Sequence, residues 1–214
     1  MGKKETIIIL GAHSDDFVLG AGGTVAQYAR EGKKVISIVF SYGEKSHPWL
    51  KEEIIKKRRA EETFKASMIL HCQTIFFDLE EFKLHQRYHH QKIEEKLLQL
   101  LRTEKPTKIF THSAEDPHPD HRDVHKITLE LYGKSAPKPE VYMYSVWNPV
   151  SFQTRYPAFY VDITATFSTK LKALRMFHSQ KIHIIYPFLL LLYKAVKDGF
   201  KIRKRFGEHF FRIR

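Results

Sequence analysis

The sequence predicts an α/β protein with a mostly parallel, doubly wound sheet and helices on both of its faces. Two observations support this class. Short apolar strands alternate with helical segments over the first two thirds of the chain, an order that is typical of βαβ units. The hydrophobic fraction of 43% over 214 residues is also sufficient for the core of one ordinary domain.

The predicted strands are short runs that are rich in β-branched or aromatic residues. The first of them is bounded by Gly11, and apolar runs of this length between turn residues are typical of strands buried in a parallel sheet. We expect six strands, at Thr6–Ala12, Lys34–Phe40, Gln73–Leu79, Lys108–His112, Glu140–Val146 and Ala158–Ile163.

The segments between these strands show helical spacing of their apolar residues. We expect helices at Val25–Glu31, Leu50–Leu70 and Lys92–Thr103, and a fourth that reaches about Tyr132. Gly133 would end the fourth helix. The segment Glu80–His90 is polar and contains histidines, so a surface loop is expected there.

The pattern changes after about residue 165, where we expect only helices. Ser168 is suited to cap a helix that ends near Gln180. The last segment combines the apolar run Phe188–Tyr193 with several lysines and arginines. The chain is therefore expected to form one domain, with an α/β core over 1–165 and a mainly helical C-terminal extension over 166–214.

Composition limits the classes of protein. Cys72 is the only cysteine, so neither an internal disulfide nor a cysteine-based zinc site can form. The N-terminus has no signal-peptide pattern, and the apolar stretch Ile182–Tyr193 is too short to span a bilayer, so we expect a soluble, cytoplasmic protein. The net charge of +12 is compatible with high solubility alone, an anionic substrate, an anionic membrane surface or nucleic acid.

Two polar clusters each follow a predicted strand. They are Gly11–Asp16 and Asp116–His121, and we expect both at the same edge because ligands of such sheets bind beyond the carboxyl ends of the strands. His13 and Asp16 stand three residues apart on a tight turn, and His121 can supply a third ligand. A site of two histidines and one carboxylate with an open position suits zinc, and also iron(II).

The remaining cluster residues suit the chemistry of such a site. Asp15 can take a proton from a water that the metal activates. His118 can face the open position as a cation and stabilise a developing oxyanion or protonate a leaving amine. Asp120 can accept a hydrogen bond from a histidine and so orient it. The structural alternative is that the aspartates cap a helix and the histidines are polar loop residues.

These residues resemble a known family. The segment Ala12–Thr24 resembles the opening motif of the PIG-L/LmbE-like zinc-dependent N-deacetylases, and His118-Pro119-Asp120-His121 resembles the second motif of that family. The resemblance covers nearly the whole chain. Its further matching positions are Gly43-Glu44, Arg59, Glu62, Pro106, Asp162-Ile163-Thr164, Lys170, Ala173, Ser179-Gln180 and Gly207-Glu208-His209-Phe210.

The resemblance implies a Rossmann-like fold and a hydrolase. The implied reaction removes the acetyl group from an N-acetylglucosamine-containing small molecule or glycoconjugate, with release of acetate and a free amine. The implied residue roles are zinc ligation by His13, Asp16 and His121, general-base catalysis by Asp15, electrostatic or acid assistance by His118, and substrate contact by Glu44 and Arg59. The sequence departs from the family at Ser14, which usually is a proline, and at Asp116, where the mycothiol-pathway branch carries a tyrosine.

Two further histidine features have open interpretations. His125 follows His121 by four residues and shares its helix face, so we expect it to face the substrate or to support a ligand. The cluster of His85, His89 and His90 is interpreted as a solvated loop in preference to a second metal site.

Alternatives to this enzyme remain. The apolar and basic C-terminal segment either packs on the sheet or on a second copy in a homo-oligomer, or rests on an anionic membrane. The chain would otherwise be a non-catalytic basic module for an anionic ligand, or a metal hydrolase of another amide. Nucleic acid is not expected as a partner, because the basic residues are spread along the chain and no aromatic–basic RNA motif is present.

Overall fold

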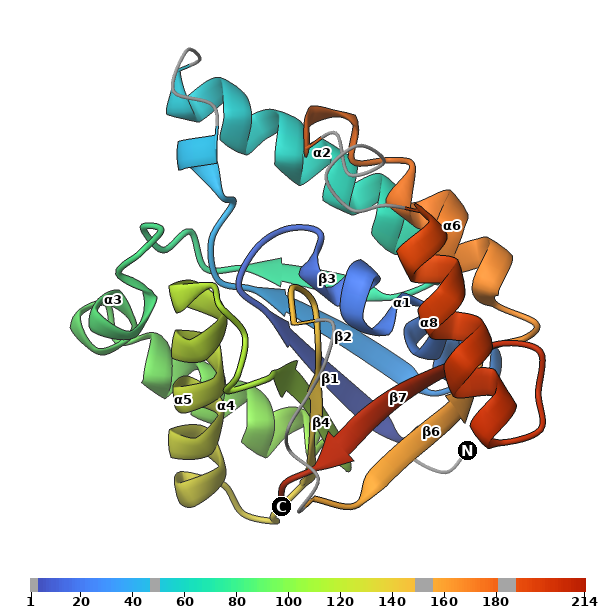
Figure 1. Ribbon diagram of the computed structural model, residues 1–214. Helices are drawn as coiled ribbons and strands as arrows, with labels where there is room; N and C mark the ends of the chain where they lie inside the picture. Colours follow the sequence, from blue (N-terminus) through green and yellow to red (C-terminus); the bar gives the residue numbers. More distant parts are fainter. Residues whose placement is uncertain (1–3, 47–50, 149–155, 181–187) are drawn as a thin grey trace.

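The computed structural model describes residues 4–46, 51–148, 156–180 and 188–214. Within these residues one seven-stranded sheet forms the centre, with the strand order β3-β2-β1-β4-β5-β7-β6 (Figure 1). The strands β1 to β5 pair in parallel, and β7 is antiparallel to both of its neighbours. The strands are β1 (Thr6–Gly11), β2 (Lys34–Val39), β3 (Gln73–Phe76), β4 (Lys108–His112), β5 (Glu140–Tyr144), β6 (Ala158–Asp162) and β7 (Gly207–Arg212).

Helices cover both faces of this sheet, which confirms the predicted α/β class. On one face lie α1 (Asp16–Arg30), α2 (Glu52–Leu70), α6 (Phe167–Leu174) and α8 (Phe188–Lys201). On the other face lie α3 (Leu84–His90), α4 (Ile93–Glu104) and α5 (Pro119–Lys134). Two short 3₁₀ helices, η1 (Glu44–Ser46) and η2 (His178–Gln180), complete the described helical segments.

The central strand β1 shows why its sequence is a continuous apolar run. Ile7 and Ile9 belong to the hydrophobic cluster on one face, whereas Ile8 and Leu10 belong to the cluster on the other face. Successive side chains of a strand point to opposite faces. A central parallel strand covered on both faces therefore needs apolar residues at every position.

The C-terminal part contains one element that differs from the expectation. Gly207–Arg212 forms β7 between β5 and β6, so the prediction that only helices follow residue 165 is wrong. The strand pattern is concealed by Glu208, whose buried carboxylate accepts hydrogen bonds from the backbone N–H groups of Gly23 and Thr24 in α1. A charged residue at a buried strand position is unusual unless it is paired.

The segment after β3 also differs. Its residues Leu84–His90 form α3, so the predicted surface loop over Glu80–His90 is partly wrong. Leu84 and Tyr88 are fully buried, and their spacing of four residues places them on one face of a single helical turn. The polar majority of this segment conceals that short apolar face from a periodicity argument.

The other expected strands, together with α4 and α5, are present with ends shifted by a few residues. Two helices differ more. α1 begins at Asp16 and not at Val25, and the helix expected from Ser168 to about Gln180 is α6, which has Thr166 at its N-cap and ends at Leu174. The predicted helix start at Leu50 and residues 182–187 of the apolar stretch lie outside the described part of the chain. Within the described ranges, no helix is long and apolar enough to cross a bilayer.

Two glycines of α1 allow other segments to approach closely. A Cβ atom on Gly20 would lie 2.2 Å from a ring carbon of Tyr144, and one on Gly23 would lie 2.8 Å from Ile163. Both contacts are too short for any larger residue. The glycine-rich stretch therefore serves the packing of α1 against the end of β5 and the segment that follows β6.

Candidate active site

The candidate site lies at the carboxyl ends of β1 and β4, which are neighbours in the sheet. The connection after β1 leads to α1 on one face, and the connection after β4 leads to α5 on the other. Such a point is where open α/β sheets form their ligand crevice. The turn before α1 carries His13 and Asp15, and the start of α5 carries His118 and His121. The fold therefore brings the two polar clusters to one edge.

Asp16 is at the centre of the buried cluster. Its Oδ2 accepts a hydrogen bond from the backbone N–H of His13 at 2.7 Å and lies 3.5 Å from His13 Nδ1. Its Oδ1 lies 3.3 Å from His121 Nε2, and Oδ2 lies 3.2 Å from His112 Nε2. One carboxylate therefore joins histidines from the β1 turn, the end of β4 and the first turn of α5.

Asp120 holds the ring of His13 from the opposite side. Its Oδ2 lies 3.1 Å from His13 Nε2, and its Oδ1 accepts a hydrogen bond from the backbone N–H of Phe82 at 2.9 Å. Glu81 Oε1 lies 3.4 Å from the same ring nitrogen. With Nε2 occupied by these carboxylates, Nδ1 is the nitrogen of His13 that faces Asp16. Asp120 is therefore in contact with a site histidine, and its role in orienting that ring stays a prediction.

His118 caps α5 with its side chain. Its Nδ1 accepts a hydrogen bond from the backbone N–H of Asp120 at 3.2 Å, and an accepting ring nitrogen carries no proton. Burial, together with the charges of His13 and His121, lowers the pKa of His118 to about 4. The structure therefore favours a neutral His118 with its proton on Nε2 over the predicted cation.

Asp116 supports His121. Its Oδ1 lies 3.0 Å from His121 Nδ1, while Oδ1 and Oδ2 accept hydrogen bonds from the backbone N–H groups of His118 and Trp147. Asp116 stands where the mycothiol branch carries a tyrosine, and in this chain it contacts the ring of His121. Tyr144 does not replace the missing tyrosine, because its hydroxyl is buried and donates to the carbonyl oxygen of Leu10 at 2.7 Å.

The two adjacent aspartates differ in their electrostatics. Burial, reinforced by the charge of Asp16, raises the pKa of Asp15 to about 6. Burial also acts on Asp16, but the charges of His121 and His112 outweigh it and hold the pKa of Asp16 well below its usual value. Groups of one type with diverging environments are typical of sites in which they have different roles.

Asp15 is held by a second group of side chains on α2 and η2. With its amide oriented to satisfy both neighbours, Gln180 donates to Asp15 Oδ2 at 2.9 Å and accepts from the guanidinium of Arg59 at 3.1 and 3.3 Å. Ser179 donates through its N–H and its hydroxyl to Glu62, at 2.8 and 2.6 Å. Asp15 stands at the N-cap of α1 but makes no side-chain cap hydrogen bond, so the capping alternative does not explain it.

The donors present fit a divalent metal. Both ring nitrogens of His121 are buried, and the carboxylates of Asp116 and Asp16 approach them at 3.0 and 3.3 Å without completing a hydrogen bond. Buried polar atoms left in this way require an explanation. His13, His118 and His121 form one group with ligand atoms within 4.8 Å of one another, and Asp16, His112 and His121 form another. Histidine nitrogens and carboxylate oxygens are the ligands that zinc uses in catalytic sites.

Arg59, Glu44 and His125 were predicted to contact the substrate, and none of them lies in the cluster of histidines and carboxylates around Asp16. Arg59 and Glu44 are 4% and 3% exposed. The guanidinium of Arg59 also donates to the carbonyl oxygen of Tyr42 at 2.5 Å, and Glu44 accepts from the hydroxyl of Ser41 at 3.1 Å. His125 lies 2.9 Å from the carbonyl oxygen of His112 and lines a separate pocket with Met143 and Ile213. The structure does not bring His125 into the cluster.

Sequence reasoning missed several residues of the site. His112 is fully buried and stacks on His121 with ring centroids 3.9 Å apart, and its position as the last residue of a predicted strand was an available signal. Glu81 has no local pattern that points to this site, and Gln180 is a matching position of the family resemblance to which no role was given. They reach it only because α2, η2 and the turn after β3 fold over the edge of the sheet.

Comparison with known proteins decides the family. The model of the PIG-L family, described as GlcNAc-PI de-N-acetylase, matches residues 8–132. This chain belongs to the PIG-L family. The matched span includes both polar clusters, all of β4 and β1 from Ile8 onward. Members of the family are generally dependent on a divalent metal, and a hydrolase or deacetylase is the activity that membership supports.

The PIG-L relatives of this chain are named for different activities. The 4-oxalmesaconate hydratase of Pseudomonas putida is 26% identical over 197 residues, which cover 83% of this chain and 75% of the hydratase. An uncharacterised deacetylase of Escherichia coli, YaiS, is 26% identical over 133 residues, or 59% of this chain and 68% of YaiS.

Solved structures agree with this PIG-L fold. GalB, the 4-carboxy-2-hydroxymuconate hydratase of Pseudomonas putida, superimposes with a TM-score of 0.83 at 22% identity, covering 98% of this chain and 96% of GalB. The N,N'-diacetylchitobiose deacetylase of Pyrococcus horikoshii has a TM-score of 0.80 at 23% identity, covering 98% of this chain and 84% of the deacetylase. At these identities the likeness establishes the fold.

Proposed function

We propose that this PIG-L protein is a zinc-dependent N-deacetylase that hydrolyses the acetamide of an N-acetylglucosamine-containing small molecule or glycoconjugate. The observation that carries the proposal is the buried pair of adjacent carboxylates. Asp16 faces three histidines, whereas Asp15 is turned to Gln180 and Arg59 and touches none of them within hydrogen-bond distance. This difference supports the proposal that one carboxylate holds a metal and the other transfers a proton.

His13, Asp16 and His121 would hold the metal. The Nδ1 of His13 faces Asp16, and the Nε2 of His121 faces the same carboxylate. Asp120 and Asp116 would keep the two rings in place from behind. When bound there, zinc would lower the pKa of a water molecule and polarise the acetyl carbonyl.

Asp15 is the proposed general base. It takes a proton from the attacking water as the new C–O bond forms, and it returns that proton to the nitrogen as the C–N bond breaks. Acetate and a free amine are the products. Gln180 holds one oxygen of Asp15 through its N–H, which leaves the other oxygen for the water.

His118 is the proposed hydrogen-bond donor to the substrate. Its Nδ1 is occupied by the cap of α5, so Nε2–H is the group that remains. A neutral donor aimed at the carbonyl oxygen stabilises the negative charge that develops there. The ring packs between Phe82 and His13, with centroids 5.7 and 4.8 Å away, and this packing fixes its direction.

Arg59 and Glu44 were expected to contact the substrate, but both are almost completely buried. We propose instead that Arg59 positions Asp15 through Gln180, and that Glu44 supports this group from η1. A substrate contact by His125 stays a prediction without a supporting contact.

Acetate release from a panel of N-acetylglucosamine conjugates tests this function. The panel varies the group attached to the sugar, and each assay is run after removal of metal by a chelator and after its restoration. Acetate release that depends on metal supports the proposal. If no member of the panel releases acetate with any divalent metal, including Fe²⁺, the proposed reaction is wrong.

A second candidate reaction is hydration of an unsaturated carboxylic acid, because a relative that is 26% identical is named as a hydratase. The same metal ligands and base would serve addition of water to a polarised double bond. Loss of ultraviolet absorbance of an unsaturated dicarboxylate, with no acetate formed, would favour this reaction. The two assays run on one preparation separate the candidates.

The surface of α8 suggests where an amphiphilic substrate would be found. Leu189, Tyr193 and Phe200 are 75%, 62% and 82% exposed, and Lys194, Lys197 and Lys201 lie on the same helix. Apolar residues flanked by lysines are typical of helices that lie in an anionic membrane surface. Peripheral membrane contact is therefore proposed for this segment, and burial of the same face in a homo-oligomer is the competing outcome.

A further inference from the structure

A second group of metal-binding side chains lies outside the candidate active site, between α3 and α5. His85 Nε2 lies 2.7 Å from Glu130 Oε1, and His89 Nε2 lies 3.3 Å from Glu130 Oε2. The two imidazole rings are perpendicular, with centroids 4.9 Å apart. Figure 1 shows α3 beside α5 on the face that also carries α4. The three side chains thus converge from two helices.

The spacing of these residues explains the convergence. His85 and His89 are four residues apart on α3, so they stand on the same side of the helix, one turn apart. Glu130 belongs to α5 and reaches across with one oxygen toward each ring. The three ligand atoms all lie within 4.8 Å of one another. Two imidazole nitrogens and a carboxylate oxygen are a donor set that zinc binds at about 2.0–2.2 Å.

An independent observation indicates that the group lacks a partner. Glu130 Oε2 is buried and accepts no hydrogen bond, although His89 Nε2 is only 3.3 Å away, because the geometry of that approach does not make one. A buried carboxylate oxygen without a donor is costly. A cation between Oε2 and the two rings would remove that cost, whereas a simple histidine–glutamate pair leaves the oxygen unsatisfied.

We propose that His85, His89 and Glu130 bind one divalent transition metal ion, with zinc as the best match. The side chains are about one third or more exposed (34%, 45% and 33%), so water would complete the coordination. This site is separate from the candidate active site and does not depend on the proposed reaction.

The proposed metal site lies close to the turn of Glu81 and Phe82, which contacts the candidate active site. α3 begins two residues after Phe82, whose N–H binds Asp120, and Glu81 beside it approaches His13. The N–H of His85 also donates to Asp123 of α5 at 3.3 Å. A metal ion that joins α3 to α5 would therefore hold the turn of Glu81 and Phe82 against the start of α5.

Zinc stoichiometry tests the proposal. Tag-free protein is loaded with Zn²⁺, dialysed against buffer of micromolar free zinc and analysed by mass spectrometry for metal content. We expect His89→Ala and Glu130→Gln each to retain one equivalent of zinc less than the wild type. His90→Ala is the matched control, because His90 is the exposed neighbouring residue outside the group, and it should retain the wild-type amount.

Equal zinc content in the wild type, His89→Ala and Glu130→Gln would overturn the proposal. An equal loss in His90→Ala would overturn it too, since that result would indicate nonspecific binding by surface histidines. Hydrogen exchange gives a second readout: added Zn²⁺ should slow exchange of the amides of Leu84–His90 in the wild type and not in His89→Ala. Circular dichroism in the absence of zinc checks that the variants are folded.

Discussion

At the scale of single residues, the orientation of the Asp15 carboxylate depends on neighbours that are distant in the sequence. Its carboxylate is buried next to Asp16, yet it is turned away from the histidines and is held by Gln180. Gln180 in turn sits on η2, which Glu62 of α2 fastens through both polar groups of Ser179. The proposed role of Asp15 as the base therefore rests on its hydrogen bonds and not on its chemical type.

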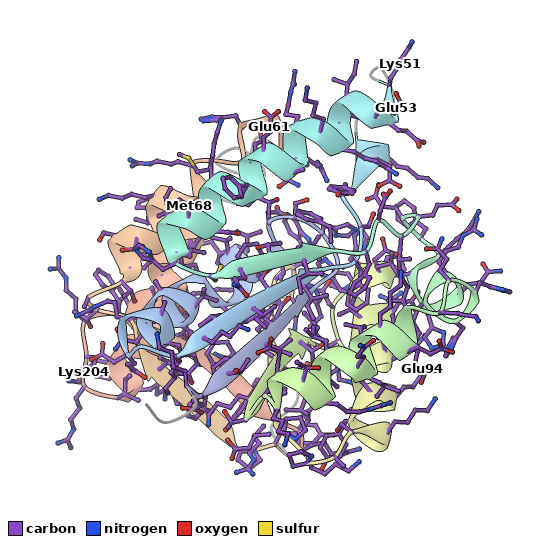
Figure 2. All side chains as sticks on the ribbon, turned by 180° about the vertical axis from the view of Figure 1, so that it is seen from behind. Lys51, Glu53, Glu61, Met68, Glu94 and Lys204 are labelled. Carbon is purple, nitrogen blue, oxygen red and sulfur yellow. The ribbon has the colours of Figure 1, made fainter. Side chains whose placement is uncertain are left out.

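The first residue-scale prediction concerns the hydrogen bonds between Glu62 and Ser179. Glu62→Gln should lower kcat by about tenfold, because outer partners that orient site residues typically contribute 10–100-fold, while the content of the catalytic metal stays unchanged. Glu61→Gln is the matched control, since Glu61 is the exposed preceding residue that Figure 2 labels on α2. Unchanged kcat in Glu62→Gln, or an equal fall in both variants, would contradict the role given to η2.

The second residue-scale prediction separates two histidines of α5. His121→Ala should lose the catalytic metal, because the remaining His13 and Asp16 leave too few protein ligands for tight binding. His125→Ala should keep it, since its ring lies on the carbonyl oxygen of His112. Metal content of the purified variants decides this, and retention of metal by His121→Ala would remove His121 from the ligand set.

At the scale of elements, β7 ties the C-terminal third of the chain to the helix that follows the site. Lys170 of α6 donates to the carbonyl oxygen of Leu19 at 2.7 Å and to Glu208 at 2.6 Å, and Glu208 also accepts from Gly23 and Thr24. All of these groups are buried. Breaking such a pair leaves an uncompensated charge, which is more costly than removing both partners.

Glu208→Ala should therefore destabilise the protein by about 3–5 kcal/mol. The double variant Lys170→Met/Glu208→Ala should lose less than the sum of the two single variants, because no unpaired charge remains. Urea unfolding of the four proteins measures this. Strict additivity would show that the two side chains act independently.

The exposed face of α8 gives the second element-scale prediction. Wild-type protein should float with liposomes that contain anionic lipid and not with neutral ones, because the lysines of α8 add electrostatic attraction to its apolar contact. Leu189→Ser/Phe200→Ser should abolish flotation, whereas Met68→Ser, which alters an exposed apolar residue of α2 (Figure 2), should not. Equal recovery with both lipids would contradict membrane contact, and a concentration-dependent dimer would favour the oligomer.

At the scale of the whole molecule, the sheet and the meeting of the two clusters could be predicted from the sequence. Parallel strands of a doubly wound sheet end at one edge, so the strand order alone brings His13 and His121 together. β7 could not be predicted in this way, because Glu208 interrupts its apolar pattern. The contact of Gln180 with Asp15 and the approach of Glu81 to His13 could not either, since both depend on tertiary packing.

The residues of the candidate site also divide into features that the sequence predicts and features that depend on the folded structure. Motif and position indicated which residues would lie at the site, but the cap hydrogen bond of His118 and the burial of Arg59 and Glu44 depend on contacts that only the folded chain makes. Membership of the PIG-L family supports a hydrolase or deacetylase. The choice between acetate release and hydration depends on which substrate binds at the candidate site.

The most direct test of the central claim is acetate release by the wild type and Asp15→Asn, measured side by side with zinc content, on an N-acetylglucosamine conjugate that the wild type hydrolyses. We expect Asp15→Asn to retain the metal and to lose activity by about a hundredfold or more, as removal of a general base typically does. Hydrolysis by Asp15→Asn at the wild-type rate with the metal in place would contradict the assignment of Asp15 as the base.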